Sequence, residues 1–326
     1  MSKKIFFKDN ATIDRATIDS TGVFFSNELQ RLDPVLHEPM ASFPFARDID
    51  VVDLDVADET TAFDRLNFYA AGGEKSTGKS FISSKSTEIP GVNVDSERVT
   101  AKTFLWGQSV QKSVVELAQA QKLGRPLDPQ LFSALQLKLN LDSQGMTMLG
   151  DTKAGVYGLC NSTLVTESQV ANNAGSTSRL WTAKTDEEVL TDINTVLAAC
   201  WAATGYTMCP DRLGLAPAKF SYLLSRKLDN GSMSLAKFLA ENSLSNSMNG
   251  KPLEIVPIRE LASIASGTTD RMVAYTKRED VVRWPRSVLL SLPVQNIGLN
   301  QVSIYYCRFG TVEFVKPEAC YFAYGY

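Results

Sequence analysis

The chain has 326 residues, of which 44% are hydrophobic and 21% charged, values typical of a globular protein with one to three domains. Its 33 Lys and Arg residues against 36 Asp and Glu give a net charge of −3, which argues against a protein that coats nucleic acid. No segment approaches the roughly 20 apolar residues of a membrane span, and the start is too short and too polar for a signal peptide.

Residues 1–64 are predicted to form an extended N-terminal arm. Six basic against thirteen acidic residues give this segment a charge of −7, and three prolines interrupt any helical pattern. The apolar residues between 49 and 56 allow one strand. The acids that end the segment are either a solvated face or a docking surface for a basic partner, and the candidates for such contact are Asp48, Asp50, Asp53 and Asp55.

Residues Gly73–Ser80 match the phosphate-binding pattern G-x-x-x-x-G-K-[ST]. That motif works only where a buried strand leads into a helix, whose N-terminus holds the phosphates. Residues 64–71 are no apolar strand, and residues 81–91 are rich in Ser and β-branched residues and end in Pro-Gly, so no helix should follow. We interpret the segment as a flexible loop and keep a nucleotide site as the weaker alternative.

Residues 65–108 predict a long two-stranded loop, because β-prone runs flank a tip rich in Gly, Ser and Lys. Six basic against four acidic residues give it a charge of +2. An acidic arm and a mildly basic loop suggest pairing between copies of the chain. The candidate intersubunit residues of the loop are Lys75, Lys79, Lys85 and Arg98. Such pairing would be sensitive to salt, and assembly indifferent to ionic strength would count against it.

Two helices are predicted next. The first has Val110, Val114 and Leu117 on one face. The second begins at Asp128-Pro129, an N-cap followed by proline, and runs to about Leu149, a length of roughly 30 Å. A glycine inside it, at position 145, costs on the order of 1 kcal/mol relative to alanine. Close packing against a neighbouring element is one explanation for that glycine.

From Trp181 onward the pattern becomes α/β. Thr185 and Glu188 form a capping box that begins a helix, and Pro217 opens another, in which Phe220, Leu223 and Leu224 are expected to be buried. Strands are expected at 253–258 and 272–276. The tail from position 287 is β-rich, with an apolar run at 288–294 and strands near 302–306 and 312–315. The aromatic cluster at 321–326 is expected to lie against the core.

The five cysteines, at positions 160, 200, 209, 307 and 320, form no C-x-x-C pair. They predict buried free thiols rather than disulfides or a metal site. The single histidine, His37, is more typical of a structural residue, because zinc sites and Ser–His or Cys–His machinery normally need more. We expect no catalytic residue, no metal and no cofactor.

Several segments carry a family resemblance. They are Gly155–Asn161, Trp181–Glu188, Asp192–Asn194, Trp201–Tyr206, Cys209–Leu213 and Pro217–Phe220. Together with the order of the predicted elements, they resemble the tailed-phage major capsid proteins of the Hong Kong 97 type, in the encapsulating-protein-like branch. The resemblance spans roughly residues 60–326 and is weak in the arm.

The resemblance implies an α+β fold of four parts. These are an N-terminal arm (1–64), an extended loop that reaches over a neighbour (65–108), a peripheral domain with a long spine helix (109–180 and 286–326) and an axial domain (181–285). It implies a non-enzymatic protein that self-assembles, through pentamers and hexamers, into the icosahedral head of a tailed bacteriophage in the host cytoplasm. Further implied partners are a separate scaffolding protein, a portal, a decoration protein and packaged double-stranded DNA, contacted non-specifically.

Three alternatives remain open at this point. A protein nanocompartment of the same fold would enclose a cargo enzyme instead of a genome. A P-loop NTPase would bind ATP with magnesium through Lys79 and Ser80, and Lys79→Ala would abolish that binding. A tail or baseplate protein is disfavoured by the α/β region. If the loop joins copies of the chain, deleting residues 70–90 should leave a folded subunit but block stable shells.

Overall fold

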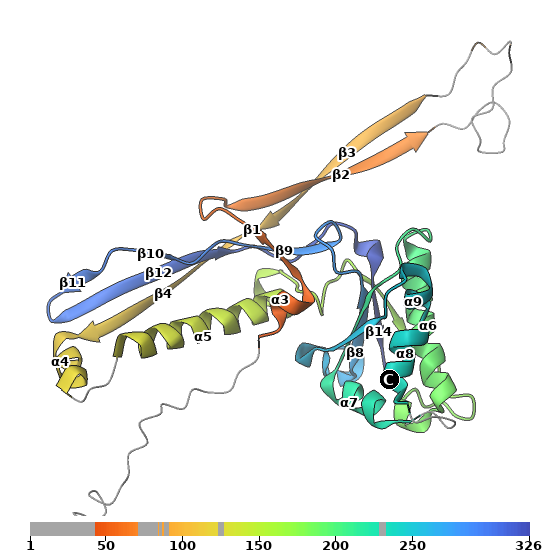
Figure 1. Ribbon diagram of the computed structural model, residues 1–326. Coiled ribbons are helices and arrows are strands. Elements are labelled where there is room, and N and C mark those ends of the chain that lie inside the picture. The colour runs from red at the N-terminus through yellow and green to blue at the C-terminus, as the bar shows by residue number, and fades with distance from the viewer. Residues whose placement is uncertain (1–42, 71–83, 85–86, 88–90, 123–126, 228–232) are drawn as a thin grey trace, which may run out of the picture. The chain divides into compact units, whose positions relative to one another are not determined.

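The computed structural model describes residues 43–70, 84, 87, 91–122, 127–227 and 233–326 (Figure 1). Lys75, Lys79, Lys85, the motif at Gly73–Ser80 and His37 lie outside these residues, so the predictions about them are not tested here. All the described residues belong to one compact unit, Phe43–Tyr326. Across the described part of the chain, no helix is long and apolar enough to cross a membrane.

The first sheet is built around one long strand, β12 (Asn300–Phe309). This strand pairs antiparallel with β4 (Phe104–Ser113) over ten residues. The remaining strands are β1 (Asp50–Asp53), β9 (Val282–Arg286), β10 (Leu290–Ser291), β11 (Gln295–Ile297) and β13 (Glu313–Phe314). In this sheet β1 is parallel to β9, whereas β10, β11 and β13 pair antiparallel with their neighbours.

The first predicted helix begins later than expected. Val110 lies in β4, opposite Ser303, and α4 covers only Val114–Lys122. The apolar spacing of Val110, Val114 and Leu117 fits a helix, but backbone pairing with β12 holds the chain extended through Ser113.

The second predicted helix is present as α5 (Leu127–Met148), which starts two residues before Pro129. Leu135, Leu139 and Met148 are buried on it. The close-packing explanation for Gly145 is wrong, because a Cβ added there would meet nothing within 4 Å. The tight turn after α5 does need a glycine: a Cβ on Gly158 would lie 2.3 Å from the carbonyl carbon of Met148.

The second sheet has the strand order β5-β14-β8-β6-β7. Its strands are β5 (Thr166–Gln169), β6 (Arg212–Leu215), β7 (Glu254–Pro257), β8 (Arg271–Tyr275) and β14 (Cys320–Tyr324). Helices α6 (Asp186–Ala203), α7 (Pro217–Ser225), α8 (Leu235–Asn242) and α9 (Leu244–Asn249) accompany it (Figure 1). Short 3₁₀ turns lie at Thr152–Ala154, Trp181–Ala183, Arg259–Leu261, Ser266–Thr268 and Pro317–Ala319.

Two of the helix starts predicted from local chemistry, those of α6 and α7, are confirmed. The Thr185 side chain accepts from the Glu188 amide while the Glu188 carboxylate accepts from the Thr185 amide, which is the complete capping box of α6. Pro217 stands at the start of α7, where Leu223 is buried. The prediction for Leu224 is wrong, since this side chain is 50% exposed.

The C-terminal strand belongs to a different sheet from the one implied by the predicted domains. β14 pairs with β8 and β5 rather than with the strands around β12. The expectation that this segment lies against the core is confirmed, because Phe322, Ala323 and Tyr326 are buried. All five cysteines are buried free thiols, as predicted.

Two apolar clusters hold the unit together. One joins both sheets and includes Trp284, Phe309, Tyr275 and Phe322. The other lies between α6, α7, α8 and the second sheet and includes Trp181, Ile193 and Leu215. The first cluster thus provides the apolar surface buried between the two sheets, and the second provides the apolar surface buried between the helices and the second sheet.

Candidate functional site

The predicted two-stranded loop is present as a ribbon. It consists of β2 (Thr60–Ala70) and β3 (Val92–Lys102), which form a separate two-stranded sheet in antiparallel register from Thr60 opposite Lys102 to Ala70 opposite Val92. Its boundaries differ from the prediction at both ends. The ribbon starts before position 65, and residues 104–108 belong to β4 in the larger sheet.

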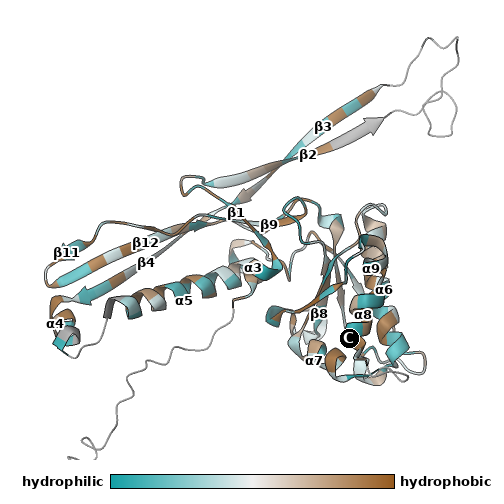
Figure 2. Cartoon of the chain, in the orientation of Figure 1, coloured by the Kyte–Doolittle hydropathy of each residue, from teal (hydrophilic) through white to brown (hydrophobic). Residues whose placement is uncertain are grey.

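The two faces of the ribbon differ in character. Val92, Val94 and Ser96 alternate onto one face, and Leu66 stands opposite Ser96 in register. Leu66 and Val94 are each 58% exposed and Val92 is 69% exposed. Asn67 and Asp95 occupy the other face at the same level of the ribbon. The alternation of hydrophilic and hydrophobic residues along β3 is visible in Figure 2. A two-stranded ribbon with one exposed apolar face has no core of its own.

Arg65 attaches the base of the ribbon to β13. Its guanidinium donates to the carbonyl oxygens of Val315 at 3.1 Å and Phe314 at 2.8 Å. The Arg65 and Arg283 guanidinium groups also lie 5.7 and 5.8 Å from the ring centre of Phe63. These contacts fix the proximal end of β2 through backbone acceptors and a cation–π cluster.

A second attachment lies at the junction of β3 and β4. The Thr103 hydroxyl lies 2.9 Å from the carbonyl oxygen of Asp58 and 2.7 Å from that of Glu59. The Arg308 guanidinium donates to the same Asp58 oxygen at 2.6 Å. The base of the ribbon is therefore held from both strands, whereas its distal apolar face is open.

The structure brings Arg98 together with Asp64 across the ribbon. Their side chains pair at 2.9 Å, and the hydrogen bond from Arg98 lowers the pKa of the Asp64 carboxyl. Both groups are exposed, so the pair contributes little to stability. A role for Arg98 between subunits stays a prediction and would compete with this internal partner.

The acidic candidates are not equivalent. Asp53, the last residue of β1, and Asp55, two residues later, are exposed, and Asp50 pairs with Lys277 at 3.4 Å. Their intersubunit roles remain predictions. Asp48 requires a correction, because it is 0% exposed and its carboxylate pairs with Arg47 at 2.6 Å inside the subunit. Burial raises the pKa of Asp48 against the opposing effect of Arg47. It is a structural residue that no neighbouring subunit can reach in this conformation.

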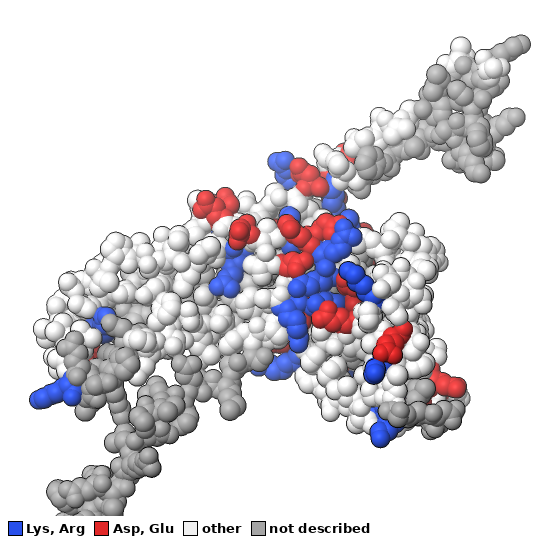
Figure 3. All heavy atoms as spheres, viewed as in Figure 1, with Lys and Arg blue, Asp and Glu red and all other residues white. Residues whose placement is uncertain are grey.

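A second apolar surface was missed by the sequence interpretation. The sequence has an apolar run at 288–294 in a tail predicted to be β-rich, and only Leu290–Ser291 of it pairs, as β10. Val288, Val294, Ile297 and Leu299 are between 57% and 71% exposed. Figure 3 shows few charged side chains over β10–β12, whereas charges gather around β1 and β9. Exposed apolar surface of this extent marks a contact surface on a soluble protein.

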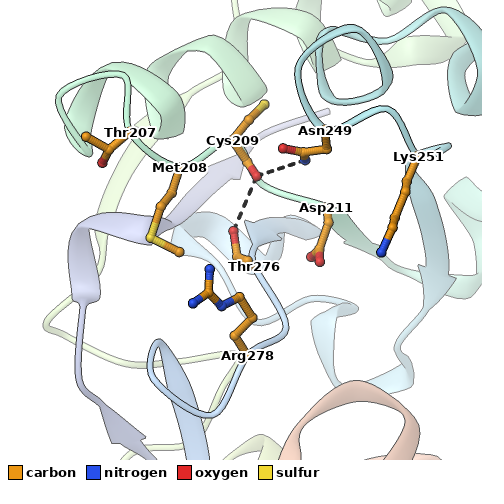
Figure 4. Close-up of a pocket in the computed structure, with 8 residues that line it drawn as sticks. All are labelled: Thr207, Met208, Cys209, Asp211, Asn249, Lys251, Thr276 and Arg278. Atoms are coloured by element: carbon orange, nitrogen blue, oxygen red, sulfur yellow. Dashed lines mark hydrogen bonds between the residues drawn. The ribbon is translucent and has the colours of Figure 1, made fainter.

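One hollow of about 260 Å³ lies beside the start of β6 (Figure 4). Several of the polar groups that line it are engaged within the chain. The Cys209 carbonyl accepts from Asn249 and Thr276, Asp211 accepts from the Lys277 amide, and Arg278 pairs with Asp280. We assign this hollow no ligand. Among the residues described by the structure, no group of three His, Cys, Asp or Glu side chains could hold a metal ion.

Two of three comparisons with known proteins found matches, and both point to capsid proteins. A family model described as "Major capsid protein" matches residues 78–325. A search of curated proteins found no match.

Solved structures show the same fold. The capsid of Myoviridae phage XM1 has a TM-score of 0.73 at 15% identity, covering 92% of this chain and 98% of that chain. A structure from Gordonia phage Cozz has a TM-score of 0.53 at 11% identity, with 93% of each chain covered. A virus-like particle from Pyrococcus furiosus has a TM-score of 0.52 at 11% identity, covering 85% of this chain and 91% of that chain. At these identities the likeness establishes the fold, which is the Hong Kong 97-type capsid fold predicted from the sequence.

Proposed function

The chain belongs to the major capsid protein family, and on this premise we propose that its copies assemble into the icosahedral head of a tailed bacteriophage that encloses double-stranded DNA. The shell would consist of pentamers and hexamers and would form in the host cytoplasm with a scaffolding protein and a portal. The protein would have a structural role and no catalytic one.

The observation that carries the proposal is the anchored ribbon with an open apolar face. Arg65, Thr103 and Arg308 hold its base to the rest of the subunit, while Leu66, Val92 and Val94 are exposed on one distal face. Exposing three large apolar side chains has a free-energy cost in water that is relieved when another surface covers them. A second copy of the chain supplies such a surface, and the exposed apolar residues at 288–299 are one candidate.

Many weak contacts of this kind are sufficient for a shell. Each subunit that joins a ring presents the next contact at a high effective concentration, so modest pairwise affinity produces a stable assembly. A net charge of −3 is compatible with a wall that surrounds DNA without binding it tightly.

Negative-stain electron microscopy of the purified recombinant chain tests this function. We expect closed hollow particles, or rings of five and six subunits. A chain that stays monomeric at every concentration and hydrolyses ATP would contradict the proposal and favour the P-loop alternative.

A nanocompartment shell is the second candidate, supported by the likeness to the virus-like particle from Pyrococcus furiosus. The material enclosed in particles from the native source separates the two functions. Double-stranded DNA supports a phage head, whereas a packaged enzyme supports a nanocompartment.

A further inference from the structure

Residues 43–53, which we call the strap, join residues 1–42 to the segment that leads into the ribbon. The strap consists of the four-residue helix α3 (Phe45–Asp48) followed by β1. It contacts three separate parts of the subunit, namely α5, the β12 sheet and the second sheet. This is more than an extended arm requires. The strand allowed between 49 and 56 is present as β1, whereas the helix α3 was not predicted.

The strap is packed into the core that both sheets share. Phe45 is 8% exposed and Ile49 is 1% exposed, and both belong to the apolar cluster that joins the two sheets. The Phe45 ring meets Trp284 of β9 edge-on at 5.6 Å. The Phe45 amide donates to the Gln144 side chain of α5 at 3.0 Å. Two apolar anchors, the Phe45 amide bond and the parallel pairing of β1 with β9 thus fix the strap to α5 and β9.

The second sheet holds the strap through its carbonyl groups. Lys277 Nζ donates to the Ala46 oxygen at 3.2 Å and to the Arg47 oxygen at 2.9 Å. The Tyr275 hydroxyl donates to the Asp48 oxygen at 2.8 Å. Arg212 also donates to the Arg47 oxygen. These carbonyls belong to the last turn of α3, where a helix leaves its acceptors unpaired.

The strap lies on a surface, its seat, that α5, β9 and the second sheet form, and the two shortest ion pairs around it do not cross the boundary between them, whereas the Asp50–Lys277 pair crosses it at 3.4 Å. Arg47 pairs with Asp48 inside the strap at 2.6 and 3.0 Å. Arg212 lies 2.6 Å from Glu254, which belongs to the second sheet, but 3.9 Å from Asp48. If the strap left its seat, the Arg47–Asp48 and Arg212–Glu254 pairs would stay intact. Undocking would therefore leave neither Asp48 nor Arg212 without an ionic partner.

The strap also leads directly to the base of the ribbon. The Leu54 amide donates to the Arg286 oxygen at 3.2 Å, just after β1. A short turn then delivers the Asp58 and Glu59 carbonyls that Arg308 and Thr103 hold, and β2 follows at Thr60. A short stretch of chain therefore connects the strap to the ribbon, so a movement of the strap can displace the start of β2.

We propose that the strap is a conformational relay: it docks and undocks as one unit across the two sheets, and its docking positions the base of the β2–β3 ribbon. The relay couples the contacts of the strap to the base of the ribbon within one subunit. It does not depend on the proposed function, because it concerns the subunit before any assembly.

Hydrogen exchange of the full-length chain, measured by mass spectrometry on the smallest species isolated by size exclusion, tests the relay. The variants are Lys277→Ala, which removes two carbonyl bonds and the pair with Asp50, and Tyr275→Phe, which removes one carbonyl bond and keeps the buried ring. Each should raise exchange across residues 43–53 by about tenfold. Exchange in residues 60–66 should rise severalfold, while α6 stays unchanged.

Arg278→Ala is the matched control, because Arg278 is adjacent to Lys277 and pairs with Asp280 rather than with the strap. This variant should leave exchange at 43–66 as in the parent chain. A rise confined to residues 43–53 would overturn the coupling to the ribbon. An equal rise in α6 would indicate global loosening and overturn the separate unit, and unchanged exchange in the two variants would overturn the whole proposal.

Discussion

The α6 region and the ribbon differ in how their side chains are paired and covered. Around α6, Lys184 and Asp192 are paired at 1% and 5% side-chain exposure, and Lys184 also donates to the Ala171 carbonyl at 2.7 Å. The Trp181 indole donates to Asp192 at 3.2 Å. On the ribbon, by contrast, the distal apolar residues have no cover and the Asp64–Arg98 pair is exposed.

We propose that this difference separates the residues that fold the subunit from those that join subunits. The α6 region buries its polar groups only with partners from the same chain, so its sequence is constrained by folding. Among the described residues, the contacts that hold the ribbon lie at its base, so we infer that Leu66, Val92 and Val94 are available for a contact with another chain. Mutations in the α6 region should therefore change the free energy of unfolding, whereas mutations on the distal ribbon should change assembly.

The largest expected effect on stability comes from Asp192→Ala. The change leaves the Lys184 ammonium buried without its carboxylate, which should lower the free energy of unfolding by about 3–5 kcal/mol. Urea unfolding followed by tryptophan fluorescence measures this. Lys237→Ala, which breaks an exposed pair with Glu241 on α8, is the control and should cost under about 0.5 kcal/mol. Equal losses in the two variants would remove the distinction between buried and exposed pairs.

Two glycines near the end of α5 should respond to alanine with opposite signs. Gly158→Ala forces a Cβ against the Met148 backbone and should destabilise the subunit by about 1–3 kcal/mol. Gly145→Ala adds a methyl group in open space inside a helix and should stabilise it by up to about 1 kcal/mol. Thermal unfolding measures the stability of both variants. A stabilising Gly158→Ala would contradict the close approach of Gly158 to the Met148 backbone.

Alkaline pH should weaken the core through its thiols. Burial raises the pKa of Cys200 to about 12 and those of Cys209 and Cys307 to about 11, from an ordinary value of 9.0. Because the folded state holds the proton more tightly, this contribution to stability is complete below pH 9 and is lost as the pH rises through 11 to 12. The urea midpoint should therefore fall between pH 8 and pH 10.5, and less steeply in Cys200→Ala. If the urea midpoint fell equally steeply with pH in the parent chain and in Cys200→Ala, the contribution assigned to the buried Cys200 thiol would be contradicted.

The features that could be predicted from the sequence depend on local chemistry. The capping box at Thr185, the proline at position 217 and the paired strands of the ribbon are fixed by neighbouring residues. The misplaced features depend on partners far along the chain. β4 stays extended because β12 pairs with it, β14 selects β8 rather than β12, and Asp48 is covered partly by Tyr275 and Arg212. Spacing alone cannot distinguish a buried acid from an exposed one when its neighbours lie more than a hundred residues away.

The central claim is that the ribbon's apolar face is reserved for another copy of the chain. Sedimentation velocity of Leu66→Thr/Val94→Thr, beside urea unfolding, tests it most directly, since threonine keeps the strand propensity and removes the apolar surface. Leu224→Thr, at an equally exposed site on α7, is the matched control. We predict that the double variant unfolds within about 0.5 kcal/mol of the parent chain but no longer forms large assemblies, while the control assembles normally. Shells of normal size and yield from the double variant would contradict the account.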